Sequence, residues 1–282
     1  MKTVGNISEM TSISKNEIIK GKKIGFVPTM GALHEGHLSL VREARLDNDV
    51  TVTSIFVNPI QFGPNEDFNK YPRSIEHDSE LLRNENIDYL FLPDARQMYG
   101  NNFETYIDLK NLPAHLCGLK REGHFQGVAT VVAKLFNIVM PHTAYFGQKD
   151  YQQALIIKRM IADLNFSIDI KIMPIVRENT GLALSSRNQY LTQTQKKEAS
   201  AIYLALKLGE KLILGGENRS SVVINNVKEF ILANIEDAKI DYVCASDPEN
   251  LSDIDKIENG VLLAAAVYVG STRLIDNILI RR

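Results

Sequence analysis

The sequence has few cysteines, no excess of charge of one sign and no long apolar run. Cys117 and Cys244 lie far apart and outside any metal-ligand spacing, which argues against a disulfide framework and against a zinc site. The 32 Lys and Arg residues nearly balance the 34 Asp and Glu residues, so no basic surface for nucleic acid or for an anionic membrane is indicated. No apolar run approaches the roughly 18 residues of a membrane span, and the N-terminus does not resemble a signal peptide. We therefore expect a soluble cytoplasmic protein with no nucleic-acid and no membrane partner.

The length of the chain indicates more than one domain. Its 282 residues correspond to about two domains of roughly 150 residues each. With 44% hydrophobic and 23% charged residues, the composition is that of an ordinary globular protein. A chain of this size buries enough surface to fold without disulfides or metals.

Short apolar runs alternate with helical patterns through the first two thirds of the chain. Strands are predicted at residues 23–28, 50–57, 87–92, 143–146 and 168–173. Helices are predicted between them, at residues 37–48, 74–86, 126–140 and 149–164. This alternation predicts an α/β fold with a Rossmann-like, doubly wound and mostly parallel sheet, which we assign to residues 1–175.

A polar segment at residues 174–193 separates this region from the C-terminal part. It contains Gly and Pro and shows no long period, so it is either a linker or a functional loop. Beyond it we predict helices at residues 194–214 and 220–234, followed by strands at 240–244, 261–269 and 274–280. The pattern predicts a smaller C-terminal α+β domain at residues 176–282, which could act as a lid.

The first candidate site is Pro28–His37 (PTMGALHEGH), between a predicted strand and a predicted helix. Ligands of open α/β sheets bind beyond the carboxyl ends of strands, and a helix start near glycines offers free backbone N–H groups, so we expect a phosphate here. The spacing of Gly31 and Gly36 imitates a P-loop, but His37 stands where Lys is required. His34 and His37 could stabilise charge on a transferring phosphoryl group. A metal site and a capping turn with imidazole–backbone hydrogen bonds are the alternatives.

A second candidate site is Gly147–Gln153 (GQKDYQQ), directly after another predicted strand. A lysine in the first turn of a helix opposes the helix dipole, so an anionic ligand explains Lys149 better than helix propensity does. The alternative is an exposed lysine whose charge is offset by Asp150. A glutamine in the turn after a phosphate-binding lysine can orient a carboxylate or hydroxyl substrate, although Gln152 and Gln153 are also ordinary helix formers.

Two further polar segments complete the candidate residues. Leu184–Arg187 (LSSR) lies at the predicted domain junction, where Arg187 could bind polyphosphate oxygens with bidentate geometry. An ordinary polar turn is the alternative. Asn58–Gly63 (NPIQFG) follows a predicted strand, where Asn58 and Gln61 could hold a small polar acid.

In combination, these motifs resemble one family, the pantothenate synthetases or pantoate–β-alanine ligases, which belong to the nucleotidyltransferases with a HIGH-type signature. The matching stretches, in the family order, are residues 28–37, 54–63 (SIFVNPIQFG), 123–134 (GHFQGVATVVAK), 145–153 (YFGQKDYQQ) and 181–188 (GLALSSRN). The resemblance implies an ATP-dependent ligation of pantoate with β-alanine to pantothenate. Pantoate would first form pantoyl adenylate with release of pyrophosphate, and the amine of β-alanine would then displace AMP. It also implies Mg²⁺ bound mainly by phosphate oxygens, and a homodimer.

The resemblance also implies roles for individual residues. His37 would be the acid, and His34 and Lys149 would stabilise the transferring phosphoryl group, with Arg187 as a fourth catalytic residue. Gln61 and Gln153 would hydrogen-bond pantoate, and Gln61 would also face β-alanine; Asn58 would join them at the substrates. The ATP-binding residues would be Pro28, Thr29, Met30, Gly31, His34, Gly36, His37, Gly147, Gln148, Lys149, Asp150, Val176, Leu184, Ser185, Ser186 and Arg187.

Three positions depart from the family pattern, and two other functions remain open. Gln148 replaces an acidic residue, Leu184 a methionine and Glu122 a proline. None of the three removes a named catalytic group.

Two other functions are possible for this sequence. A nucleotidylyltransferase that does not use β-alanine is one alternative, and an ATP-sensing module without turnover is the other. We interpret His77, His115 and His142 as surface or core residues, whereas the role of His124 stays open.

Overall fold

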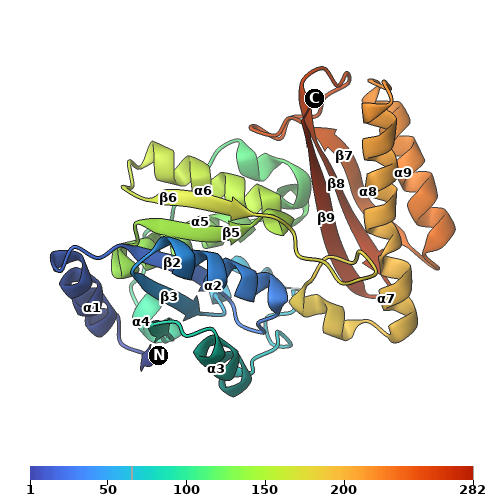
Figure 1. Cartoon of the computed structure of the whole chain (residues 1–282). Coiled ribbons are helices and arrows are strands. Elements are labelled where there is room, and N and C mark those ends of the chain that lie inside the picture. The colour runs from blue at the N-terminus through green and yellow to red at the C-terminus, as the bar shows by residue number, and fades with distance from the viewer. Residues whose placement is uncertain (65, 282) are drawn as a thin grey trace. The chain divides into compact units, whose positions relative to one another are not determined.

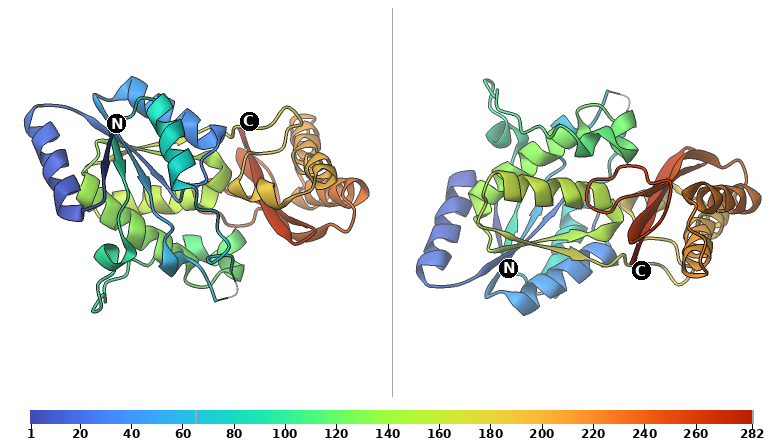
Figure 2. Two further views of the ribbon diagram at one scale, coloured as in Figure 1. Left: turned by 90° about the horizontal axis from the view of Figure 1, so that it is seen from below. Right: turned by 90° about the horizontal axis from the view of Figure 1, so that it is seen from above.

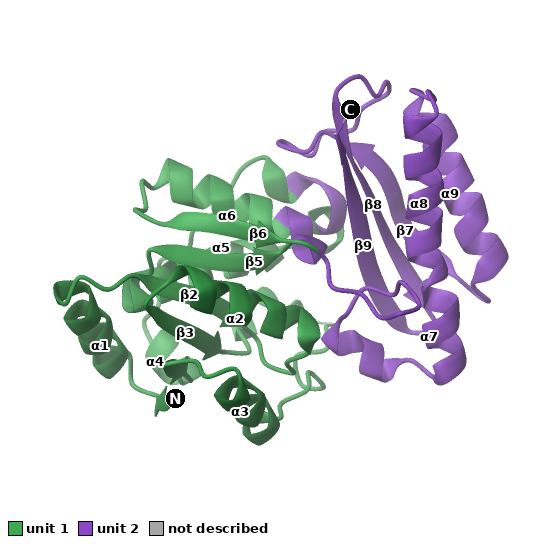
Figure 3. Ribbon diagram, in the orientation of Figure 1, with its two compact units in different colours: residues 1–113, 118–147, 153–174 green, residues 114–117, 148–152, 175–282 purple. Residues whose placement is uncertain are grey.

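The chain consists of two compact units, coloured separately in Figure 3. The computed structural model describes residues 1–64 and 66–281. Unit 1 comprises residues 1–113, 118–147 and 153–174, and unit 2 comprises residues 114–117, 148–152 and 175–282. The division into domains at 1–175 and 176–282 stays a prediction.

Unit 1 contains a six-stranded parallel sheet with the strand order β1-β4-β3-β2-β5-β6. Its strands are β1 (Lys2–Val4), β2 (Ile24–Thr29), β3 (Val50–Ile55), β4 (Tyr89–Phe91), β5 (Thr143–Gly147) and β6 (Asp169–Met173). From β2 the chain proceeds through β3 and β4 in one direction, and β5 and β6 follow on the other side of β2. The carboxyl ends of β2 and β5 therefore flank the topological switch point, where doubly wound sheets bind their ligands.

Helices cover both faces of this sheet (Figures 1 and 2). One face carries α2 (Glu35–Asp47) and α3 (Ile75–Asn84), and the other carries α5 (His124–Val139) and α6 (Tyr151–Asp163). The helix predicted at residues 126–140 corresponds to α5, and its apolar residues are buried, as shown by Val128, Val132 and Phe136. The remaining helices before α6 are α1 (Ile7–Ile19), α4 (Ala95–Met98) and the 3₁₀ helices η1 (Pro59–Gln61), η2 (Leu112–Ala114) and η3 (Leu116–Lys120).

Unit 2 is a small α+β arrangement. Its antiparallel sheet has the order β7 (Lys239–Ser246), β8 (Gly260–Val269) and β9 (Thr272–Arg281). Helices α8 (Ala201–Leu214) and α9 (Ser220–Asn234) pack on this sheet (Figure 1), in a core that includes Leu206, Val227 and Leu263. The other helices are α7 (Gln193–Ala199), η4 (Gln148–Asp150) and η5 (Ser186–Tyr190). The predicted fold class is thus confirmed, with a parallel α/β sheet and a smaller α+β part.

The structure corrects three details of the predicted elements. The helix predicted at 194–214 is divided at Ser200, whose hydroxyl donates to the Lys197 carbonyl and so competes with the helical pattern. The helix predicted to start at Lys149 starts at Tyr151, and Lys149 lies in the tighter turn η4. Neither β1 nor α1 was predicted, because β1 has three residues and α1 buries polar side chains such as Ser14 and Glu17.

None of the helices formed by residues 1–64 and 66–281 is both long enough and apolar enough to span a membrane.

Candidate functional site

The loop between β2 and α2 is held by its own hydrogen bonds. Seven backbone N–H groups, those of residues 31–34 and 36–38, donate to acceptors within unit 1. The acceptors are the Thr29 hydroxyl, the Asp78 carboxylate, the imidazole nitrogens of His34 and His37, and the His34 carbonyl. The expectation that this helix start offers free backbone N–H groups to an anion is therefore wrong for these seven groups.

His34 and His37 form a capping box at the start of α2. The Gly36 N–H donates to His34 Nδ1 at 3.2 Å, and the His34 N–H donates to His37 Nδ1 at 3.3 Å. The two ring centroids are 4.1 Å apart. Because an Nδ1 atom that accepts a hydrogen bond carries no proton, each neutral ring has its proton on Nε2. The capping turn is thus confirmed, and it leaves both imidazoles as Nε2–H donors.

Asp78 anchors the same loop and was not predicted from the sequence. Its side chain on α3 is 1% exposed, and its two oxygens accept the N–H groups of Ala32 at 2.8 Å and Leu33 at 2.9 Å. This anchoring holds Gly31 and Ala32 in the left-handed region, at φ values of 81° and 51°. An acidic residue in the first turn of a helix is common for electrostatic reasons, so Asp78 offered no distinctive signal.

Asn58 and Gln61 follow β3 and are joined by a hydrogen bond. Asn58 Nδ2 donates to Gln61 Oε1 at 3.0 Å and to the Gly127 carbonyl at 3.1 Å, and its Oδ1 accepts the Tyr99 hydroxyl at 2.7 Å. Asn58 is fully buried, so these contacts make it a residue that orients Gln61. The hydrogen bond to Oε1 fixes the orientation of the Gln61 amide group. Its Nε2 donates to Met30 Sδ at 3.1 Å. The structure thus brings the first and fourth motifs together.

His124 connects Gln61 to a partly buried ion pair. Its Nε2 lies 2.8 Å from Arg121 Nη1 and its Nδ1 lies 2.8 Å from the Gln61 carbonyl. Because a guanidinium group only donates, Nε2 accepts and the Nδ1–H donates to Gln61. Arg121 also binds both oxygens of Glu66, at 2.6 and 2.7 Å. Burial is the largest influence on the pKa of Glu66 and raises it, but the hydrogen bonds and charge of Arg121, together with the Gly63 N–H, outweigh burial and hold that pKa below its usual value.

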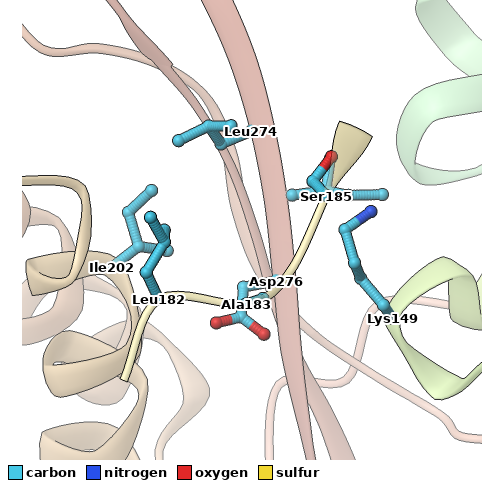
Figure 4. A pocket seen from close by; sticks show the side chains of 8 residues that line it. Lys149, Leu182, Ala183, Ser185, Ile202, Leu274 and Asp276 are labelled. Carbon is cyan, nitrogen blue, oxygen red and sulfur yellow. The ribbon is translucent and has the colours of Figure 1, made fainter. Parts of the chain in front are cut away.

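Lys149 lines a small pocket that lies entirely within unit 2 (Figure 4). The other lining residues are Leu182, Ala183, Ser185, Ile202, Leu274, Ile275 and Asp276. Lys149 Nζ lies 3.5 Å from Asp150 Oδ1, so the predicted charge offset is present. Figure 4 shows the Lys149 amine on the same side of the pocket as Ser185. Two residues from separate motifs therefore meet here.

The polar segment predicted at residues 174–193 is an ordered loop. Arg177 and Ala183 form an isolated antiparallel bridge, and the Leu184 N–H donates to the Val176 carbonyl at 3.0 Å. Ser185 then caps η5 by accepting the Arg187 N–H at 3.3 Å. The loop therefore places Val176 and Leu184 side by side and starts η5 just before Arg187.

The candidate residues are distributed over both units. Unit 1 holds Pro28, Thr29, Met30, Gly31, His34, Gly36, His37, Asn58, Gln61, Gly147 and Gln153, whereas unit 2 holds Gln148, Lys149, Asp150, Val176, Leu184, Ser185, Ser186 and Arg187. Nowhere in residues 1–64 and 66–281 do three or more His, Cys, Asp or Glu side chains converge in a way that could hold a metal ion. Of the other histidines, His77 is exposed and His142 Nδ1 accepts the Ile24 N–H at 3.0 Å.

Known proteins resemble this chain over nearly its whole length. A family model described as pantoate-beta-alanine ligase matches residues 2–279. The pantothenate synthetase of Fervidobacterium nodosum is 54% identical over 280 residues, which cover 99% of each chain. That of Moorella thermoacetica is 56% identical over 261 residues, 93% of this chain and 92% of the relative.

Solved structures agree with the sequence comparison. The crystal structure of pantothenate synthetase from Thermus thermophilus matches with a TM-score of 0.93 at 42% identity and covers 99% of both chains. A pantoate-beta-alanine ligase from Francisella tularensis, complexed with beta-gamma ATP and beta-alanine, matches with a TM-score of 0.79 at 38% identity, over 99% of this chain and 97% of that one. The chain belongs to the pantoate–β-alanine ligase family.

Proposed function

We propose that this chain performs the reaction of its family with the residues described above. The reaction is the ATP-dependent ligation of pantoate with β-alanine to pantothenate, through pantoyl adenylate and with release of pyrophosphate and AMP. The observation that carries the assignment of residues is the loop after β2, where the capping box fixes His34 and His37 as Nε2–H donors. Donors fixed in advance are what a phosphoryl transfer requires, because they need no reorganisation as charge develops.

In the first half-reaction, the pantoate carboxylate attacks the α-phosphate of ATP and pyrophosphate leaves. Negative charge grows on the phosphate oxygens during this step. Most backbone N–H groups of the loop already have acceptors, so side chains must supply the stabilisation. We assign this role to the imidazoles of His34 and His37 together with Lys149 and Arg187. The other ATP-binding residues named from the sequence keep their proposed roles.

Pantoate binding is assigned to Gln61 and Gln153. Because Asn58 donates to the amide oxygen of Gln61, the orientation of this amide is fixed, and its nitrogen can donate to a carboxylate or a hydroxyl oxygen of the ligand. In the second half-reaction the β-alanine amine attacks the acyl carbon of the adenylate, an amide bond forms and AMP leaves. Water must be kept from the adenylate between the two steps. We propose that residues 185–187 and the C-terminal part of the chain close over it, as lids commonly do.

We further propose that Mg²⁺ accompanies ATP. A magnesium ion prefers to keep water ligands and to bind substrate phosphates with one or two carboxylates, so the phosphate oxygens would be its main ligands. When bound, it would neutralise part of the phosphate charge. We also propose a homodimer, on the basis of the family resemblance. The balanced charge and the two free cysteines support a location in the cytoplasm.

The test is the pantoate-dependent exchange of labelled pyrophosphate into ATP without β-alanine. We expect exchange, and we expect AMP and pantothenate to appear in equal amounts once β-alanine is added. His37→Ala should lower the exchange rate by about 10²-fold, the cost of losing a preorganised donor. The matched control is His77→Ala, at an exposed position, which should exchange at the wild-type rate. Folded, ATP-binding protein that shows no exchange would contradict the proposal, and exchange without pantothenate would favour a nucleotidylyltransferase.

A further inference from the structure

Asn277 on strand β9 lies outside every motif of the sequence, yet its side chain holds the turn that carries Lys149. Asn277 is 4% exposed. Its Nδ2 donates to the carbonyl oxygens of Gln148 and Lys149, both at 3.0 Å. Its Oδ1 accepts from Gln148 Nε2 at 3.2 Å. One buried amide group therefore binds two successive carbonyl groups of η4 and the side chain of the first of these residues.

The neighbouring residue ties the same strand to the polar loop of unit 2. The Asp276 carboxylate is 5% exposed and accepts from Arg177 Nη1 at 2.5 Å and from Nη2 at 2.9 Å. Arg177 also donates to the Gly181 carbonyl at 3.2 Å and stacks on the Tyr203 ring at 3.8 Å. Two consecutive residues of one strand thus hold the Lys149 turn and the loop that leads to Ser185. Both the turn and the loop line the pocket of Figure 4.

The turn needs this support because η4 is a short 3₁₀ helix. Such a helix has poor hydrogen-bond geometry, and its backbone can relax into the α-helix that follows. The amide of Asn277 lies on a strand of a sheet and donates to two carbonyl groups of this turn in its 3₁₀ conformation. Lys149 is held in this turn, ahead of the first residue of α6.

We propose that Asn277 is a positioning residue for Lys149. It fixes the backbone of η4, so that the lysine side chain extends from a rigid base toward the phosphoryl group. The proposal rests on the role of Lys149 in the proposed function. A misplacement of about 1 Å can lower a rate by about 10²-fold, so loss of the two donors should lower the reaction rate by up to about that factor.

The test compares Asn277→Ala and Asn277→Asp with the wild type in the pyrophosphate exchange assay. We expect both variants to lower the maximal rate by about 10-fold or more, with the half-saturating pantoate concentration changed by less than about threefold. Asn277→Asp keeps the side-chain volume but turns carboxylate oxygens toward the two carbonyl groups. The matched control is Asn226→Ala, which removes an amide that donates to the Val222 carbonyl on α9 of the same unit.

A double-mutant cycle shows whether Asn277 acts through Lys149. In the Lys149→Ala background, Asn277→Ala should lower the remaining rate by less than about twofold, because residues that act as a unit are not additive. The same factor of loss in both backgrounds would overturn the proposal. If Asn277→Ala does not fold, Asn277→Ser, which keeps one donor, takes its place in the cycle.

Hydrogen–deuterium exchange separates this proposal from the proposed function. In Asn277→Ala, peptides that cover residues 147–153 should take up deuterium faster, whereas peptides of α9 should not change. Unchanged uptake at residues 147–153 would refute the positioning role even in an active enzyme. A wild-type protein without pyrophosphate exchange would refute the proposed function, and the uptake measurement would still decide whether Asn277 fixes the turn.

Discussion

Replacement of Asp78 by Asn should damage both the stability of unit 1 and the chemistry of the loop after β2. The Asp78 oxygens accept the N–H groups of Ala32 and Leu33 inside the protein. An Asn side chain has the same shape, but it has one acceptor oxygen and one NH₂ group. One backbone N–H would therefore face a donor, and the other would lose a charged acceptor. A hydrogen bond to a charged group contributes about 1.5–3 kcal/mol, so we expect a loss of about 2–4 kcal/mol in the free energy of unfolding.

Asp78→Asn should also lower the rate of pyrophosphate exchange, by about 10-fold or more, because the loop positions His34 and His37. The chain has no tryptophan, so unfolding in urea is best followed by far-UV circular dichroism. Glu76→Gln, at an exposed position on the same helix, is the control and should change the free energy of unfolding by less than about 0.5 kcal/mol. If Asp78→Asn behaves like this control in both assays, the anchoring role of Asp78 is wrong.

Two further predictions concern the support of Gln61. Gly127→Ala would place a Cβ 2.7 Å from Gln61 Cα, so it should lower the melting temperature and raise the KM for pantoate. Gly100→Ala is the control and should do neither, because nothing lies within 4 Å of the added Cβ. An unchanged KM in Gly127→Ala would contradict the role of this contact. The pKa of Glu66 is lowered in the folded state by the Arg121 hydrogen bonds, although burial opposes this. Its stabilising effect is therefore fully present above the ordinary pKa of 4.5 and is lost as the pH falls below that value. The difference in unfolding free energy between the wild type and Glu66→Gln should shrink accordingly in acid, and a difference independent of pH would contradict this assignment.

The alternation of apolar runs and helical patterns determined most of the fold. Each predicted strand overlaps an observed strand, from β2 to β9. This agreement is expected because the spacing of apolar residues within a strand or a helix indicates which of its faces is buried. Polar motifs also stand where predicted, directly after β2, β3 and β5. A parallel sheet collects the residues after its strand ends at one edge, so a local pattern was enough to predict that these motifs follow strand ends, where open α/β sheets bind ligands.

The tertiary structure alone decided how those residues are held. Asp78 supports a loop 45 positions away in the chain, and Asn277 supports a turn 128 positions away. No periodic pattern marks such residues, because a single buried hydrogen-bonding side chain does not affect the types of residue next to it in the sequence. For the same reason, the hydrogen bond from Asn58 to Gln61 and the 3₁₀ turn at Lys149 could not be predicted from the sequence. The sequence thus predicted which groups we propose for the chemistry, whereas long-range hydrogen bonds determine the backbone from which these groups extend.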